Sequence, residues 1–169
     1  MSISRILVVG AGQMGAGIAQ VAAQAEMAVT LTDISVDYAR RGLDRISKTL
    51  GRLVDKGRLA TEERDSILSR ITVAPDLEAA ARGADLVIEA IVEERAAKSD
   101  LWSRLADICP PDVIFASNTS SISITSMGSD SRRADRFIGM HFMNPVPVMQ
   151  LVEVVRGLET SDSVCDTIV

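Results

Sequence analysis

A histidine and a glutamate lie twelve residues apart near the end of the chain. His141 is the single histidine among 169 residues, and imidazole is the side chain whose ordinary pKa allows proton transfer near neutral pH. Glu153 lies among apolar residues, so we expect it to be buried and to need a partner. If the flanking strands pair antiparallel about Pro147, positions that sum to 294 face each other, and His141 meets Glu153. Such a carboxylate orients the imidazole and stabilises its cation. The alternative for His141 is a core histidine at a strand end.

A run of short polar side chains precedes this pair, at Ser117-Asn118-Thr119-Ser120-Ser121. One interpretation is a helix cap before Ile122, a common use of Ser, Thr and Asn. The other is a binding site, because the run follows an apolar strand, as do segments 89–93 and 141–144. The carboxyl ends of parallel strands meet at one edge of a sheet, where ligands bind.

A glycine loop, Gly10-Ala11-Gly12-Gln13-Met14-Gly15, follows the first apolar segment. In a GxGxxG loop the first glycine allows a tight turn, the second lets the backbone approach a pyrophosphate, and the third lets helix and strand pack closely. Asp33 follows 18 residues after Gly15, where a carboxylate accepts hydrogen bonds from ribose hydroxyls and repels a 2′-phosphate. These features favour NAD over NADP. The alternative is a glycine-rich turn with Asp33 as a helix cap.

The elements that carry these residues alternate between short apolar strands and amphipathic helices. We expect strands at 5–9, 27–32, 71–73, 84–90, 113–116, 136–140 and 151–155, and helices at 14–25, 36–55, 61–69, 94–108 and 122–127, with another beginning at Ser161. The first helix has no glycine near residues 24–26 for a left-handed cap. The pattern predicts an α/β, Rossmann-like doubly wound sheet, mostly parallel with a final antiparallel pair.

Composition sets further limits. Apolar residues make up 47% and charged residues 24%, which is typical of one globular domain, and 3% aromatics predict an aliphatic core. The net charge of −5 disfavours nucleic acid as a partner. No segment approaches the roughly 20 apolar residues that span a membrane. Cys109 and Cys165 lack metal-ligand spacing, so we expect no metal site, free thiols and a cytoplasmic location.

Five segments in order resemble the NAD-binding domain of 3-hydroxyacyl-CoA dehydrogenases, including bacterial 3-hydroxybutyryl-CoA dehydrogenases. The similarity covers nearly the whole chain and lies in segments 10–20, 89–93, 115–121, 141–149 and 151–154. It implies a 3-hydroxyacyl-CoA or 3-oxoacyl-CoA substrate and NAD as cofactor. It also implies a helical dimerisation domain after residue 169, beyond an NAD-binding domain at 1–169, and a homodimer of the full-length protein.

The resemblance also implies roles for individual residues. His141 matches the catalytic base and Glu153 its partner, while Ser120 and Asn144 match positions around the substrate's 3-oxygen and the nicotinamide. Lys56 matches the region that meets CoA, although a solvated helix face remains the alternative. The residues matched to NAD are Gly10, Gly12, Gln13, Met14, Gly15, Asp33, Glu93, Lys98, Asn118 and Asn144. Two other functions stay open: a non-catalytic NAD-binding relative, and a dehydrogenase of small free hydroxy acids.

Overall fold

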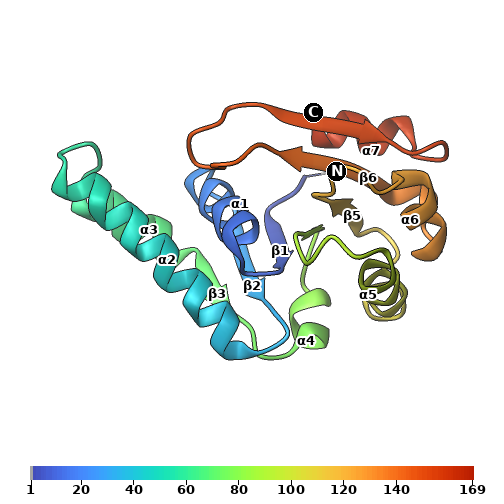
Figure 1. Ribbon diagram of the computed structural model, residues 1–169, viewed down its shortest axis with the longest axis horizontal. Helices are drawn as coiled ribbons and strands as arrows, with labels where there is room; N and C mark the ends of the chain where they lie inside the picture. Colours follow the sequence, from blue (N-terminus) through green and yellow to red (C-terminus); the bar gives the residue numbers. More distant parts are fainter. Residues whose placement is uncertain (1) are drawn as a thin grey trace.

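The computed structural model describes residues 2–169 and contains one seven-stranded sheet (Figure 1). The strand order is β3-β2-β1-β4-β5-β6-β7. The β6–β7 pair is antiparallel and the other neighbours are parallel, which confirms the predicted sheet. The strands are β1 (Arg5–Val9), β2 (Ala28–Thr32), β3 (Ile71–Val73), β4 (Leu86–Glu89), β5 (Ile114–Ser117), β6 (Phe137–Phe142) and β7 (Val152–Arg156).

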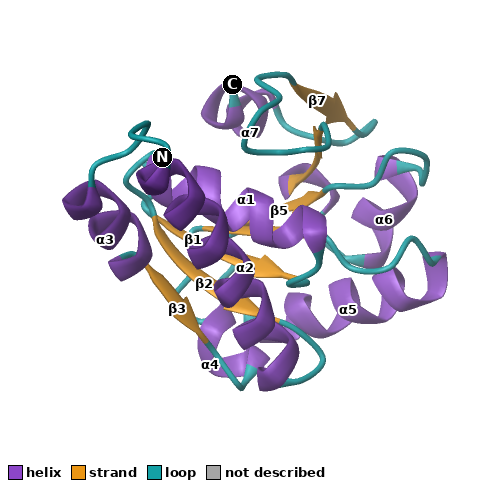
Figure 2. Cartoon of the chain, turned by 60° about the vertical axis from the view of Figure 1, so that its left-hand side comes forward, coloured by secondary structure: helices purple, strands orange, loops and turns teal. Residues whose placement is uncertain are grey.

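Helices cover both faces of the sheet, and Figure 2 shows them on either side of its central strands. One face packs against α1, α2, α3 and α7, and the other against α4, α5 and α6. The helices are α1 (Gln13–Gln24), α2 (Val36–Asp55), α3 (Thr61–Ser69), α4 (Leu77–Ala81), α5 (Arg95–Ile108), α6 (Ile124–Asp130) and α7 (Asp162–Ile168), with a short 3₁₀ helix at Ala134–Arg136. Among residues 2–169, no helix combines the length and apolarity needed to cross a bilayer.

The two faces differ in core composition. The α1–α2 side is mainly aliphatic, as predicted. The α5 side instead centres on Trp102, which is fully buried. Its ring centroid lies 5.1 Å from that of Phe115 and 4.8 Å from that of Phe137. Few aromatic residues are present, but three of them form one cluster beneath β5 and β6.

The sequence patterns locate most element ends to within two residues, with two larger differences. Helix α4 is not predicted; it is a short helix that begins at Leu77, after the N-cap residue Asp76, whose side chain accepts from the Glu78 N–H at 2.9 Å. Helix α6 begins at Ile124 rather than 122 and continues to Asp130, because Ser123 caps it by accepting from the Ser126 N–H at 3.3 Å. The polar run at 117–121 is therefore not the cap of this helix.

Helix α1 ends without a glycine because Glu26 adopts the left-handed conformation, with φ of 65°. The Met27 N–H donates to the Ala22 carbonyl at 3.1 Å, and the Glu26 N–H donates to the Ala23 carbonyl at 3.2 Å. These two bonds make a Schellman motif, which satisfies carbonyls at the helix end. A left-handed conformation costs a non-glycine residue about 1–2 kcal/mol, so this cap is strained at Glu26.

Candidate active site

The glycine loop joins β1 to α1 and brings two backbone segments into close contact. Gly10 has φ of 101°, and a Cβ there would lie 2.4 Å from the Ala90 carbonyl oxygen. A Cβ on Gly15 would lie 1.7 Å from the Gly10 oxygen, so this glycine permits the packing of helix on strand. Around Gly12, by contrast, no atom of the described residues lies within 4 Å of the position of a Cβ. The contacts at Gly10 and Gly15 agree with the tight turn and the close packing predicted from the motif, and the space at Gly12 is open.

The open space at Gly12 coincides with the start of α1. Gly12 is the N-cap residue, and no side chain in residues 2–169 caps the helix. The first N–H groups of a helix have no partner inside it, and together with the helix dipole they attract anions. An open cradle with free N–H groups fits the pyrophosphate of a dinucleotide.

Asp33 follows β2 at the wall of a cleft of about 850 Å³. Its two carboxylate oxygens accept from the Ala11 N–H at 2.6 Å and the Ile34 N–H at 2.7 Å, which fix the carboxylate beside the glycine loop. The cap of α2 is Ser35, whose hydroxyl accepts from the Tyr38 N–H at 3.4 Å. Asp33 is therefore not the helix cap that was its alternative interpretation.

A second cleft, of about 340 Å³, begins where the first one ends. Both clefts are lined by Ala90 and Ile91, which follow β4. The structure brings together seven of the predicted site residues in the second cleft: Met14, Glu93, Lys98, Asn118, Ser120, His141 and Asn144. Because these residues come from three strand ends, one helix start and α5, their meeting depends on the whole sheet.

His141 and Glu153 face each other across the antiparallel strands β6 and β7, as predicted. The distance from Nδ1 of His141 to Oε2 of Glu153 is 2.8 Å. A carboxylate only accepts, so Nδ1 carries the hydrogen and Nε2 keeps its lone pair. The expected burial of Glu153 is wrong: its side chain is 53% exposed and that of His141 is 24% exposed. The reason is that β7 is the edge strand of the sheet.

Two asparagines tie the second cleft to its surroundings. Asn118 accepts from the Phe142 N–H at 2.9 Å, which joins the end of β5 to β6. Asn144 accepts from Nε2 of Gln13 at 2.9 Å, which joins the loop after β6 to the first turn of α1. Gln13 thus reaches the site through Asn144, and Asn118 has its amide nitrogen left to donate.

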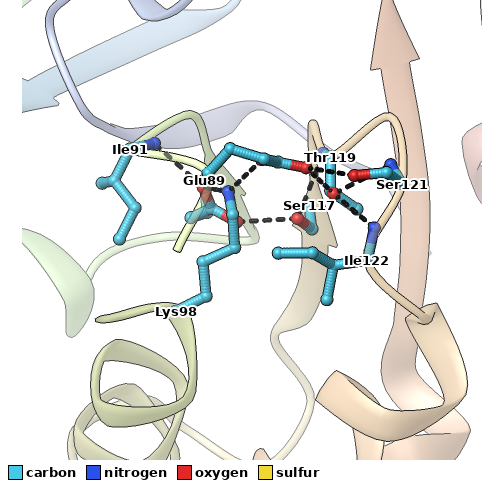
Figure 3. A network of polar contacts seen from close by, with 8 residues as sticks. Glu89, Ile91, Lys98, Ser117, Thr119, Ser121 and Ile122 are labelled. Atoms are coloured by element: carbon cyan, nitrogen blue, oxygen red, sulfur yellow. Dashed lines mark hydrogen bonds and ion pairs between the residues drawn. The ribbon is translucent and has the colours of Figure 1, made fainter. Parts of the chain in front are cut away.

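Lys98 lies in the first turns of α5 and is 1% exposed. Its ammonium contacts two carboxylates, that of Glu89 and Oε2 of Glu93 at 3.1 Å. Glu89 is fully buried and also accepts from the Ser117 hydroxyl at 2.7 Å and the Ile91 N–H at 2.9 Å (Figure 3). The three groups form a charge cluster, Glu89–Lys98–Glu93, of which Lys98 and Glu93 line the second cleft and Glu89 lies behind them.

The second carboxylate of this charge cluster is held by hydroxyl groups. Glu93 accepts from the Thr119 hydroxyl and from the Ser121 hydroxyl at 3.3 Å. Partial burial acts to raise the pKa of Glu93, but the hydrogen bonds from Thr119, Lys98 and Ser121 and the charge of Lys98 outweigh it, and the pKa is lowered from its usual value. Glu93 is therefore an anion at neutral pH.

Sequence reasoning missed part of this arrangement. The sequence places Glu89 where a predicted strand ends and gives it no role, although a glutamate within an apolar strand indicates a buried partner. Thr119 was noted only as part of the polar run. Helix α4 was missed altogether, yet its first residues line the larger cleft together with Pro75 and Asp76.

Lys56 lies apart from the two clefts. It is the exposed C-cap residue of α2, and α2 extends away from the sheet toward its α3 neighbour (Figure 1). Neither cleft is lined by Lys56.

Comparison with known proteins places the chain in a family. Residues 5–169 match the family model described as "3-hydroxyacyl-CoA dehydrogenase, NAD binding domain". A relative named 3-hydroxybutyryl-CoA dehydrogenase, from Bradyrhizobium diazoefficiens, is 46% identical over 161 residues, covering 95% of this chain and 55% of the relative.

Solved structures give the same result. The (S)-3-hydroxybutyryl-CoA dehydrogenase PaaH1 from Ralstonia eutropha superposes with a TM-score of 0.96 at 43% identity, covering 99% of this chain and 59% of that one. A diketoreductase gives a TM-score of 0.92 at 30% identity, covering 99% and 60%. This chain thus spans somewhat more than half the length of these relatives. It belongs to the 3-hydroxyacyl-CoA dehydrogenase family, as an NAD-binding domain of that family.

Proposed function

We propose that the chain takes part in the reversible, NAD-dependent oxidation of the 3-hydroxyl of a 3-hydroxyacyl-CoA to the 3-oxo compound. The observation that carries this proposal is the continuity of the two clefts at Ala90 and Ile91. One dinucleotide spanning both would have its adenosine beside Asp33 and its nicotinamide beside His141. Gly12 and the start of α1 would hold the pyrophosphate. The cofactor, when bound, supplies the hydride acceptor.

His141 acts in this proposal as the general base in oxidation and the general acid in reduction. Its Nε2 lone pair takes the proton of the 3-hydroxyl, and Glu153 stabilises the resulting cation through Nδ1. Ser120, in the same cleft, positions the reacting oxygen. General acid–base catalysis of this kind contributes about 10²- to 10⁴-fold in rate.

A path for the CoA part supports a thioester substrate rather than a free acid. A groove of about 230 Å³ shares Asn144 with the His141 cleft. The same groove shares Arg45 and Thr49 with a basic face of α2. On that face Arg41, Arg45, Lys48 and Arg52 recur at helical spacing, and Lys56 continues the row by one turn. We propose that this row, with Lys56 at its end, meets the phosphates of CoA.

We also propose that turnover needs a second, helical domain, that the full-length protein is a homodimer, and that it works in the cytoplasm. The longer relatives support the first point, since this chain covers about 55–59% of them. The two free cysteines, Cys109 and Cys165, agree with a reducing compartment.

The decisive experiment measures NADH binding by the chain and NADH oxidation in the presence of acetoacetyl-CoA. The assay is run on the chain alone and on the chain joined to the remaining segment of a relative. We expect NADH binding in both and fast turnover only in the longer protein. Binding without turnover in either form would favour a non-catalytic relative.

A second candidate function has its own support in the diketoreductase neighbour, whose described substrates are dicarbonyl compounds. Reduction of free acetoacetate or a small diketone at a rate matching that of acetoacetyl-CoA would favour it. A large preference for the thioester would favour the proposed function.

A further inference from the structure

The charge cluster Glu89–Lys98–Glu93 contains a buried ion pair that stability alone does not require. Glu89 is 0% exposed and Lys98 is 1% exposed. Replacing a buried ion pair by apolar residues of similar volume is often neutral or stabilising, because removing both charges from water is costly. The presence of this ion pair therefore calls for an explanation other than stability. Its position beside the second cleft suggests that it acts on a bound ligand.

The charge cluster carries a net charge of about one negative unit. Glu89 accepts from three donors, on Lys98, Ser117 and Ile91 (Figure 3). A protonated carboxyl group would place its own hydrogen against one of these donors, so the contacts favour the carboxylate form. Lys98 lies between two carboxylates and is the single cation among the three groups. Glu93 is an anion as well, held by Thr119 and Ser121.

This charge is fixed next to the place where the two forms of the cofactor differ. Lys98 and Glu93 line the same cleft as His141 and Ser120, on the nicotinamide side of the proposed site. The nicotinamide ring is cationic in NAD⁺ and neutral in NADH, whereas adenosine, pyrophosphate and riboses are common to both. A fixed negative charge at the wall of this cleft therefore stabilises the cationic ring of NAD⁺ more than the neutral ring of NADH.

We propose that Glu89, acting through the charge cluster, sets the preference of the site for NAD⁺ over NADH. The inference rests on the proposed function only in placing the nicotinamide beside His141. Glu89 does not touch the cleft, so it acts at a distance, by charge, while Lys98 keeps Glu93 in position.

The test is a charge series read by the ratio of two dissociation constants, that for NADH divided by that for NAD⁺. In Glu89→Gln the charge cluster becomes neutral. The amide oxygen can keep the contacts that Oε1 makes with Lys98 and Ile91, and the Ser117 hydroxyl can turn to accept from the new amide. We expect the ratio to fall by roughly three- to thirtyfold, from a unit charge several ångströms away in partly screened surroundings.

Two further variants test whether the ratio follows the net charge of the charge cluster. Lys98→Met leaves two carboxylates and should raise the ratio. The double variant, Glu89→Gln with Lys98→Met, removes the ion pair as a unit and restores one net negative charge. Its ratio should return to within about twofold of the original, even where the absolute affinities for both forms fall because Lys98 is lost.

Asp85→Asn is the matched control. Asp85 immediately precedes β4 and Glu89 ends it, so the control removes the same charge at the opposite end of the same strand. Its ratio should not change. All variants are measured by direct titration on the chain itself, without CoA substrate, and circular dichroism checks their folding.

The results distinguish an electrostatic role of Glu89 from a structural one. An unchanged ratio in folded Glu89→Gln, with both affinities reduced equally, would show a merely structural role and overturn the inference. A double variant whose ratio stays low would also overturn it. If Glu89→Gln does not fold, the opposite shift in Lys98→Met and the recovery in the double variant decide the matter. If the unmodified chain binds neither NAD⁺ nor NADH, the proposed function itself fails.

Discussion

Nδ1 of His141 lies 2.8 Å from Oε2 of Glu153, with the histidine lining the cleft and the glutamate half exposed on the edge strand. The pair therefore has one member against the proposed substrate and one outside the cleft. Changes to Glu153 can alter the imidazole without altering the shape of the cleft.

His141→Gln should reduce acetoacetyl-CoA turnover by at least about 100-fold in the catalytically complete protein, because proton transfer loses its donor. Glu153→Gln should cost less, about 10- to 100-fold, because the amide still contacts Nδ1 but no longer stabilises its cation. Steady-state NADH oxidation measures both effects, and NADH titration should show an affinity within about twofold of the original.

The exposed Glu159→Gln is the control for this pair of variants, and it should leave the rate unchanged. Retention of more than a tenth of the turnover in His141→Gln would contradict the role assigned to the histidine.

Gly12→Ala should reduce NADH affinity, whereas Gly15→Ala should reduce the stability of the fold. A methyl group on Gly12 meets no atom within 4 Å among the described residues, so the free energy of unfolding should change by no more than about 1 kcal/mol. NADH affinity should fall by about tenfold or more, because that methyl occupies the cradle. In Gly15→Ala the methyl meets the Gly10 oxygen at 1.7 Å, and the fold itself should lose several kcal/mol.

Urea denaturation and NADH titration of both variants make this comparison. A Gly12→Ala protein that binds NADH at full strength would show that the cradle is not the pyrophosphate site.

Asp33→Asn should weaken NADH binding and narrow the discrimination against NADPH, because a neutral amide no longer repels a 2′-phosphate. We expect the ratio of the two affinities to change by about tenfold. The amide oxygen of the new side chain can still accept one of the backbone N–H bonds from Ala11 or Ile34, so the loop should keep its shape. Asp37→Asn, an exposed change in the first turn of α2, is the control and should not affect the ratio.

Glu26→Gly should stabilise the protein, which is unusual for the removal of a side chain. Glycine adopts a positive φ without the strain that Glu26 bears at 65°. The loss of the weak Glu26–Arg70 ion pair, at 4.0 Å, offsets little of this gain. We expect about 0.5–1 kcal/mol by urea denaturation, whereas Glu26→Ala, which loses the ion pair but keeps the strain, should show no gain.

Cys109 should be unreactive in the native protein because burial, only partly opposed by the nearby charge of Arg133, raises its pKa to about 11. The unfolded thiol titrates near pH 8.5. Between these two pH values the unfolded state loses the thiol proton while the native state keeps it. The contribution of the buried Cys109 thiol to the free energy of unfolding is therefore fully present below about pH 8.5 and is lost as the pH rises toward 11. At pH 8 a thiol reagent should label only Cys165 in the native state and both cysteines in denaturant. Native labelling of both would contradict this expectation, and Cys165→Ser should remove the native signal.

Much of the site could be predicted from the sequence because its determinants are local. The glycine loop is one continuous segment, and the pairing of His141 with Glu153 follows from a two-residue strand period about Pro147. The parallel direction of strands β1 to β6 follows from the alternation of strand and helix.

The features that the sequence did not predict depend on contacts between segments that are distant in the chain. Glu153 has apolar neighbours and was expected to be buried, but Leu151 and Val155 are themselves 57% and 42% exposed. An apolar segment predicts a strand, but it does not show whether helices cover that strand in the fold. Helix α4 spans five residues, too few for a helical period to be visible. Glycine is the residue preferred in a left-handed helix cap, so the sequence does not predict one at Glu26. The conformation is required there because the chain turns from α1 directly into β2.

The hydrogen bond between Gln13 and Asn144 has a consequence for how the protein acquires its site. It joins residues 131 positions apart, whereas His141 and Glu153 are separated by 12. Closing a short hairpin costs much less chain entropy than bringing together the two ends of the chain. The hairpin that carries the histidine and the glutamate can therefore form early. The cleft that this hairpin helps to line needs both the first and the last third of the chain, so a ligand of this cleft would stabilise the contact between them.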